Sequence, residues 1–312
     1  MVRNEFTFPS ADGKTQIHAV EWLPDGEVRA VLQIAHGVSE YILRYEPFAE
    51  YLTDRGFAVV GHDHLGHGSS TTPDGNPMYF GPKGSWNWVV QDIETRRQLA
   101  KERFPDASYF ILGHSMGSFL LRTYLIRHPG TVNGAIIMGT GQMAPLLIAG
   151  GKAVAAVESL RIGETNASAL VQMLAFGTYN KLFAPNRTGF DWLSVNTENV
   201  DRYIADPLCG GNPSIGLFRE MLTGMSFIAT PSEVKKMDPT TPILFISGAM
   251  DPVGDCGKGV KLAHQSFLAA GIKDVTLKLY PELRHEILCE TCCDMVFEDI
   301  RQWLCSKLPP QV

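Results

Sequence analysis

Residues 111–117, with the sequence ILGHSMG, constrain the fold of this chain more than any other stretch. The apolar residues that begin it predict a buried strand, and a helical pattern follows over residues 118–127. A GxSxG sequence between a strand and a helix is typical of a strained turn that lifts a serine above the edge of a sheet. Both glycines are needed because a side chain there would clash with neighbouring elements. We therefore predict that Ser115 is a nucleophile and that the amide of Met116, which opens the helix, stabilises an oxyanion.

The rest of the chain alternates short apolar runs with helical patterns. Strands are predicted over residues 6–8 and 16–23, which form an edge hairpin, and over residues 30–35, 57–60, 109–112, 134–138, 243–247 and 275–280. Helices are predicted over residues 45–52, 86–103, 118–127, 257–270 and 287–306, and a surface loop over residues 71–85. Because strands and helices alternate, we predict the α/β class, with a mostly parallel central sheet flanked by helices.

The pattern changes between residues 142 and 234, where helical segments continue without a convincing buried strand. We predict a core formed by residues 1–141 and 235–312, and a helical cap, residues 142–234, inserted over the active site. The apolar run at residues 144–157 is too short to span a bilayer. It fits a cap packed over an acyl pocket, and it fits less well a lid that contacts lipid, because it lacks a basic polar face.

Two polar residues follow late strands, where the active sites of open α/β sheets collect. Asp251 lies just past the strand at residues 243–247, with Asp255 as a rival that is better placed to cap the next helix. His285 follows the last strand, whereas His264 falls inside a predicted helix. The order Ser, Asp, His along the chain is the order that distinguishes one fold of triad hydrolases from the others.

These motifs together carry a resemblance to a known superfamily. GHSMG, the upstream AHGVSE and DHLGHGSS, and the downstream SGAMDPVG and LRHE resemble the α/β-hydrolase superfamily, in particular its monoacylglycerol lipase, lysophospholipase and serine aminopeptidase-like branch. The resemblance covers about residues 5–142 and 235–305. It implies a catalytic triad of Ser115, Asp251 and His285, selects Asp251 over Asp255, and implies that the amide of Val38 is a second oxyanion donor beside that of Met116.

Such a triad acts on an acyl carbonyl through an acyl-enzyme. We expect a serine carboxylic-ester hydrolase whose substrate is a monoacylglycerol, a lysophospholipid or a similar small single-chain ester. One alternative is a triad-bearing receptor for small molecules with negligible turnover. Peptidase, thioesterase and acyltransferase activities also remain open, because the same residues serve all of them.

Histidines near the predicted turns raise the question of a metal. His62, His64 and His67 lie close together in sequence, and an HxH pair on such a loop is able to bind zinc. The metallo-hydrolase pattern HxHxDH is incomplete, however, because Gly66 stands where its aspartate would be. We therefore expect no metal and no cofactor. For His36 we favour a buried side chain that braces the loop over a role in proton transfer.

Composition bounds the partners and the compartment. The net charge of −6 disfavours nucleic acid and anionic bilayers, so we expect no nucleic-acid partner and at most transient lipid contact by the cap. The first 14 residues lack the apolar core of a signal peptide, which predicts a cytoplasmic protein. The six cysteines are expected to be reduced, and the CETCC sequence at residues 289–293 is expected to pack one helix face into the core rather than bind metal. Oligomeric state is not predicted.

Overall fold

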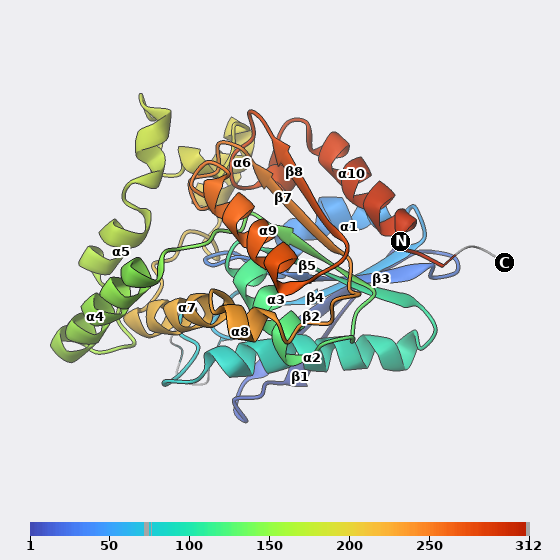
Figure 1. Cartoon of the computed structure of the whole chain (residues 1–312), viewed down its shortest axis with the longest axis horizontal. Helices are drawn as coiled ribbons and strands as arrows, with labels where there is room; N and C mark the ends of the chain where they lie inside the picture. Colours follow the sequence, from blue (N-terminus) through green and yellow to red (C-terminus); the bar gives the residue numbers. More distant parts are fainter. Residues whose placement is uncertain (72–74, 76, 310–312) are drawn as a thin grey trace.

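The computed structural model describes residues 1–71, 75 and 77–309. Its centre is one sheet of eight strands in the order β1-β2-β4-β3-β5-β6-β7-β8 (Figure 1). The strands are β1 (Val2–Pro9), β2 (Gln16–Leu23), β3 (Ala30–Ala35), β4 (Phe57–His62), β5 (Ser108–His114), β6 (Gly134–Met138), β7 (Ile243–Gly248) and β8 (Val275–Tyr280). The hairpin partner β2 is antiparallel to its neighbours β1 and β4, and every pair from β4 to β8 is parallel. The predicted mostly parallel sheet is confirmed.

Burial explains why these segments became strands. Every residue of β3, β4, β5, β6 and β7 is buried, as expected for parallel strands covered on both faces. The edge strand β1 instead alternates over much of its length, and its buried residue Phe8 pairs with Ile17 of β2, whereas β2 itself is continuously buried over residues 19–23. The apolar runs in the sequence therefore predicted the central strands, and the alternating runs predicted the edge.

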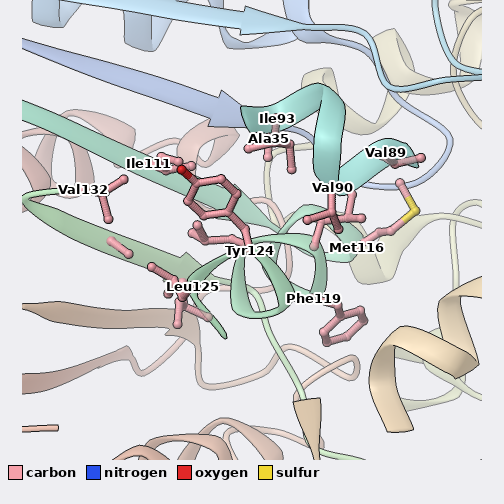
Figure 2. Packing of buried hydrophobic residues seen from close by; sticks show 14 of the residues in the cluster. Ala35, Val89, Val90, Ile93, Ile111, Met116, Phe119, Tyr124, Leu125 and Val132 are labelled. Carbon is pink, nitrogen blue, oxygen red and sulfur yellow. The ribbon is translucent and has the colours of Figure 1, made fainter. Parts of the chain in front are cut away.

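Helices cover both faces of the sheet (Figure 1). They are α1 (Glu46–Thr53), α2 (Trp86–Arg103), α3 (Met116–Arg127), α4 (Pro145–Ile162), α5 (Ala169–Phe176), α6 (Thr197–Ala205), α7 (Ile215–Ile228), α8 (Pro231–Val234), α9 (Lys258–Ala270) and α10 (Cys293–Ser306), with 3₁₀ helices η1 (Ile42–Tyr45), η2 (Tyr179–Phe183), η3 (Asp191–Leu193) and η4 (Ile287–Cys289). Apolar side chains of α1 and α10 pack on one face, and those of α2, α3 and α9 on the other. Figure 2 shows the second of these cores, where Val90 and Ile93 of α2 meet Met116 and Tyr124 of α3.

Between β6 and β7 the described chain contains helices and no strand, as the sequence predicted. Helices α4 and α5 lie at one end of the molecule, outside the layers that flank the sheet (Figure 1), and α7 packs against both α4 and α3. The buried side chain of Arg122 on α3 reaches both ends of this stretch. Its Nη1 donates to the carbonyl oxygen of Gly141 at 2.9 Å, and its Nη2 donates to the side-chain oxygen of Gln142 at 2.5 Å and lies 3.5 Å from the carbonyl oxygen of Ile228. None of the helices in the described ranges is long and apolar enough to cross a membrane.

Three local predictions need correction. The first concerns Asp255, which does not cap α9: the residue before the helix is Gly257, and no side chain accepts a hydrogen bond from the first turn. Asp255 and Cys256 have positive φ angles of 47° and 50°, a conformation that non-glycine residues rarely adopt. In this turn the Asp255 carboxylate is exposed and lies 3.8 Å from Lys258 Nζ.

The second correction concerns the predicted surface loop at residues 71–85. Residues 72–74 and 76 lie outside the described part of the chain, but Met78 and Phe80 are buried. Phe80 packs between His67 and Trp86, with ring centroids 5.8 and 6.3 Å away. Part of the segment therefore belongs to the core, while Pro82, Lys83 and Gly84 are exposed as predicted.

The third correction concerns the predicted helix at residues 287–306. The structure has two elements there, η4 and α10. Glu290 follows η4 in an extended conformation, with φ −73° and ψ 164°, so Cys289 is not on the same helix as Cys293. Cys292, Cys293 and Cys305 do pack against the core beneath α10, and all six cysteines are free, as predicted. At the break, the Glu290 side chain is bonded to a distant segment, residues 194–196.

We predict that Gly117→Ala lowers the free energy of unfolding by about 3 kcal/mol or more, since an ideal Cβ at this position would lie 2.0 Å from the carbonyl oxygen of Ala35. The matched control is Gly150→Ala in α4, where a Cβ meets no atom within 4 Å and alanine should add about 0.5–1 kcal/mol. Urea unfolding measures both. Equal stabilities for the two variants would contradict the packing argument.

Candidate active site

Ser115 lies at the turn between β5 and α3, with φ 53° and ψ −119°. A positive φ is strained for a serine, and such strain persists only where the surroundings hold it. Here the Ser115 amide donates to the carbonyl oxygen of Met138 at the end of β6 (3.0 Å), and the Ser115 carbonyl accepts from the amide and the hydroxyl of Ser118. The residue is 8% exposed, so the turn presents a serine that is buried but not sealed.

The loop after β3 lies against this serine. A Cβ built on Gly37 would lie 3.2 Å from the Cβ of Ser115, so the absence of a side chain at Gly37 permits the approach. Val38 follows in this loop, and Met116 is the first residue of α3. Within the described chain, no hydrogen-bond acceptor is found for either the Val38 or the Met116 amide. Both predicted donors are therefore on backbone that adjoins Ser115.

Asp251 and His285 come from the loops after β7 and β8. His285 Nδ1 lies 2.9 Å from Asp251 Oδ2, and both residues are buried. Asp251 also accepts from the Val253 amide (2.9 Å) and from the Ser247 hydroxyl (3.2 Å), which fixes the carboxylate. Burial by itself would lower the pKa of His285, but the charge of Asp251 and the hydrogen bond to it outweigh this effect and raise the pKa above its ordinary value. The structure thus brings these two predicted residues together.

His114, the residue before Ser115, links this pair to the loop after β3. Its ring centroid lies 4.7 Å from that of His285, and its Nε2 lies 3.3 Å from the His285 carbonyl oxygen. Its Nδ1 lies 3.0 Å from Glu40 Oε1. The same Glu40 oxygen accepts from the Gly37 amide (2.5 Å) and from the Tyr45 hydroxyl (2.9 Å). Glu40 therefore holds the loop that carries Val38.

A buried ion network extends from Glu40 to the loop of His285. Arg44 donates to Glu40 Oε2 at 2.8 Å and to both carboxylate oxygens of Glu286 at 2.6 and 2.9 Å. Asn199 of α6 donates to Glu286 at 2.6 Å. Burial would raise the pKa of Glu40, but the His114 hydrogen bond and the nearby cations hold it well below its ordinary value. For Glu286, burial is likewise outweighed by Arg44, which lowers the pKa. Our sequence analysis missed this network: the motifs AHGVSE and LRHE contain Glu40 and Glu286, but nothing in the sequence marks Arg44 as the residue that joins them.

An aromatic wall also faces the site. We use this name for Phe176, Tyr179 and Trp192. The Trp192 ring lies 5.2 Å from that of His285, Tyr179 meets Trp192 edge-on at 5.1 Å, and Phe176 stacks on Trp192 at 6.5 Å. Burial and then the charge of Asp251 raise the pKa of Tyr179. The wall comes from residues 142–234, where the sequence offered no motif to reveal it.

The histidines considered for zinc form a buried cluster with His36. His36 is fully buried, donates from Nδ1 to the Gly37 carbonyl (2.7 Å) and accepts at Nε2 from the His64 amide (2.9 Å), so its predicted bracing role is confirmed. Its ring centroid lies 4.1 Å from that of His64. Burial lowers the pKa of both, and it lowers the pKa of His62 and His67 to about 3. In residues 1–71, 75 and 77–309, no three His, Cys, Asp or Glu side chains are grouped so that they could hold a metal ion.

A serine in a strained turn between strand and helix, with an Asp–His pair at the carboxyl ends of later parallel strands, defines the class of α/β-hydrolases. Comparison with known proteins gives the family. The serine aminopeptidase, S33, family matches residues 26–292, and the chain belongs to it.

Relatives of this chain span almost its whole length. It is 27% identical to a monoacylglycerol lipase of Mycolicibacterium smegmatis, over 98% of each chain, and 27% identical to a monoglyceride lipase of Homo sapiens, over 96% of this chain and 89% of that one. Among solved structures, a thermostable carboxyl esterase from Bacillus coagulans in complex with glycerol is 28% identical, with a TM-score of 0.91 over 99% of this chain and all of that one. The chain is thus a carboxylic-ester hydrolase, as predicted.

The histidine cluster predicts a dependence of stability on pH. Both ring nitrogens of His62 have no partner among the described residues, and the folded pKa lies below the unfolded value of about 6.5. The unfolded chain therefore binds the extra proton, and stability is lost as the pH falls below the unfolded pKa. We predict that lowering the pH from 7.5 to 5.5 reduces the free energy of unfolding of the unsubstituted protein by about 1.4 kcal/mol more than that of His62→Leu.

Urea unfolding at the two pH values measures this difference, because all other titrating groups are common to both proteins. His264→Leu is a control, since that histidine lies on α9, away from the cluster. A difference that stays constant between the two pH values would show that His62 is not held neutral by burial.

Proposed function

We propose that Ser115, His285 and Asp251 form a catalytic triad that cleaves carboxylic esters through an acyl-enzyme. The observation that carries the proposal is the 2.9 Å contact between His285 Nδ1 and Asp251 Oδ2, beside the strained turn of Ser115. A serine hydroxyl is a poor nucleophile until a neighbouring base removes its proton. An Asp–His pair at the same edge of the sheet supplies such a base.

Proton transfer follows from the tautomer that this contact sets. The Asp251 carboxylate accepts a hydrogen bond, so His285 Nδ1 carries the proton and Nε2 is free to take the proton of the Ser115 hydroxyl. The imidazolium that forms is stabilised by Asp251, in keeping with the raised pKa of His285. The same imidazolium then returns its proton to the departing alcohol, and water hydrolyses the acyl-enzyme by the reverse route.

Negative charge that develops on the carbonyl oxygen needs donors that are already in place. We assign this role to the amides of Val38 and Met116. Three observations support this assignment. Gly37 closely approaches Ser115, and Met116 lies at the N-terminus of α3. The hydrogen bond from the Gly37 amide to Glu40 holds the loop that carries Val38.

For the substrate we propose a monoacylglycerol or a similar small single-chain ester, with residues 142–234 acting as a cap over the acyl chain and residues 1–141 and 235–312 as the catalytic core. The names of the relatives support the substrate class, and the aromatic wall beside His285 supports an apolar pocket. Leu146 and Leu160 of α4 are 83% and 91% exposed, which suits transient contact of the cap with a lipid surface.

Substrate choice is tested with a series of esters of increasing acyl-chain length, each with glycerol, choline or aminoacyl leaving groups. The proposal requires the highest kcat/KM for a glycerol ester. Higher activity on aminoacyl substrates would indicate a peptidase, and covalent labelling by a fluorophosphonate without turnover of any ester would indicate a receptor.

We predict that Ser115→Ala abolishes hydrolysis of p-nitrophenyl esters and labelling by a fluorophosphonate, because both need the serine oxygen. Ser266→Ala serves as the control, since Ser266 lies on α9 and donates only to the backbone oxygen of Ala263. Steady-state rates and gel-based labelling check the result. Full activity in the Ser115 variant would remove this residue from the mechanism.

The next prediction compares the two aspartates that the sequence left as candidates for the triad carboxylate, Asp251 and Asp255. Asp251→Asn should lower kcat by about 10⁴-fold, because an amide favours the wrong tautomer of His285. Asp255→Asn should leave kcat unchanged, since its carboxylate is exposed and lies 3.8 Å from Lys258 Nζ. The reverse ranking of the two variants in a kcat measurement would assign the triad carboxylate to Asp255.

A further inference from the structure

One buried carboxylate joins the cap segment to the loop of His285. Glu290 is 1% exposed, and in the described chain its side-chain oxygens accept hydrogen bonds from four donors. Oε2 accepts from the Ser194 hydroxyl (2.7 Å), from the Val195 amide (2.9 Å) and from the Asn196 amide (3.3 Å), and Oε1 accepts from the Arg284 amide (3.1 Å). A buried carboxylate with four donors is fixed in place, because losing any donor leaves a buried acceptor without its partner.

Further contacts join the same two segments on either side of His285. Before it, the Arg284 guanidinium donates to the carbonyl oxygens of Asp191 and Ser194, the latter at 3.2 Å. After it, the Glu286 amide donates to the Leu193 carbonyl at 2.7 Å. The side chain of Asn196 also donates to the Cys289 carbonyl at 3.0 Å. The loop and residues 191–196 are therefore held as one unit.

Trp192 lies inside this unit, between two residues whose carbonyls are bonded to the loop. Its own amide donates to Asn180 Oδ1 at 3.0 Å, which connects η3 to η2. Its ring packs 5.2 Å from the ring of His285, with an angle of 40° between the planes. The position of the imidazole is thus set from one side by Asp251 and from another by an indole that the cap segment supplies.

From this arrangement we propose that Glu290 is a positioning residue for the acid–base histidine, acting by clamping residues 191–196, and with them Trp192, onto the loop of His285. The proposal rests on the proposed function only in that it takes His285 as the catalytic base. It assigns residues 191–196 a fixed place in the active site, while α4 and α5 of the same insertion share none of these bonds.

Glu290→Gln tests the clamp, because the amide that replaces one oxygen is a donor and would face donors. The matched control is Glu220→Gln. Glu220 is also 1% exposed and also joins the insertion to the core, since it accepts from the amides of Gly84 (2.9 Å) and Trp86 (3.1 Å). It is bonded to the start of α2 and not to the His285 loop.

The first readout is kinetic. With a p-nitrophenyl ester, Glu290→Gln should lower kcat by about tenfold to a hundredfold, since small displacements of a reacting group cost rates of this size. Its KM should change by less than about twofold, because substrate contacts are retained. Glu220→Gln should keep the kcat of the unsubstituted protein at temperatures where far-ultraviolet circular dichroism shows it folded.

The second readout does not depend on activity. A protonated imidazole quenches the fluorescence of an indole that it touches. The difference in fluorescence between the unsubstituted protein and Trp192→Phe gives the signal of Trp192, and this signal should change with pH as His285 titrates. This titration should be lost in Glu290→Gln and retained in Glu220→Gln. If no ester is turned over by the unsubstituted protein, the proposed function fails, whereas the titration still decides the clamp.

The proposal is overturned if folded Glu290→Gln retains both the original kcat and the original titration, or if Glu220→Gln loses them equally. If Glu290→Gln does not fold, Ser194→Ala replaces it, because this variant removes the 2.7 Å donor and leaves the carboxylate. A several-fold loss of kcat with a weakened titration in Ser194→Ala supports the clamp. Unchanged values of both overturn it.

Discussion

The geometry of the site depends on one close approach between two backbones. The first turn of α3 packs against the end of β3 so tightly that a Cβ on Gly117 would lie 2.0 Å from the carbonyl oxygen of Ala35. This contact places the loop after β3 beside the turn that holds Ser115 at a positive φ. The position of the proposed nucleophile and the backbone amides proposed as anion donors are therefore products of the same packing contact, and neither depends on a flexible side chain.

Buried charge then orients the remaining loops. Glu40 and Glu286 share Arg44, and Glu290 is satisfied by donors from residues 194–196 and from Arg284. A carboxylate removed from water must be paired or hydrogen-bonded, because its desolvation costs on the order of several kcal/mol. Each of these carboxylates connects a loop of the site to another segment. Their energetic requirement for partners is what holds loops of distant origin in one arrangement.

Prediction from sequence succeeded where a local rule applies. The buried strands β3 to β7 are mostly apolar runs, and the glycines of GHSMG signal a turn that no other residue fits. It failed where the deciding contact is remote in sequence. Asp255 has the composition of a helix cap, yet its backbone is left-handed and α9 begins without it. The break before α10 lies at Glu290, whose side chain is bonded to residues 194–196, about 95 positions away.

By itself, the sequence determined the fold class, the turn at Ser115 and the loops in which Asp251 and His285 lie, because burial periodicity and steric demands act over a few neighbouring residues. Only the tertiary structure decided which polar side chains surround those loops. Nothing in the sequence marks the partners of Glu40, Glu290 or Trp192, and the roles of these residues depend on distances between segments that are adjacent only after folding. Hydrogen bonds and ring contacts of this kind are short-ranged, so their partners are set by the packed chain and not by spacing along it.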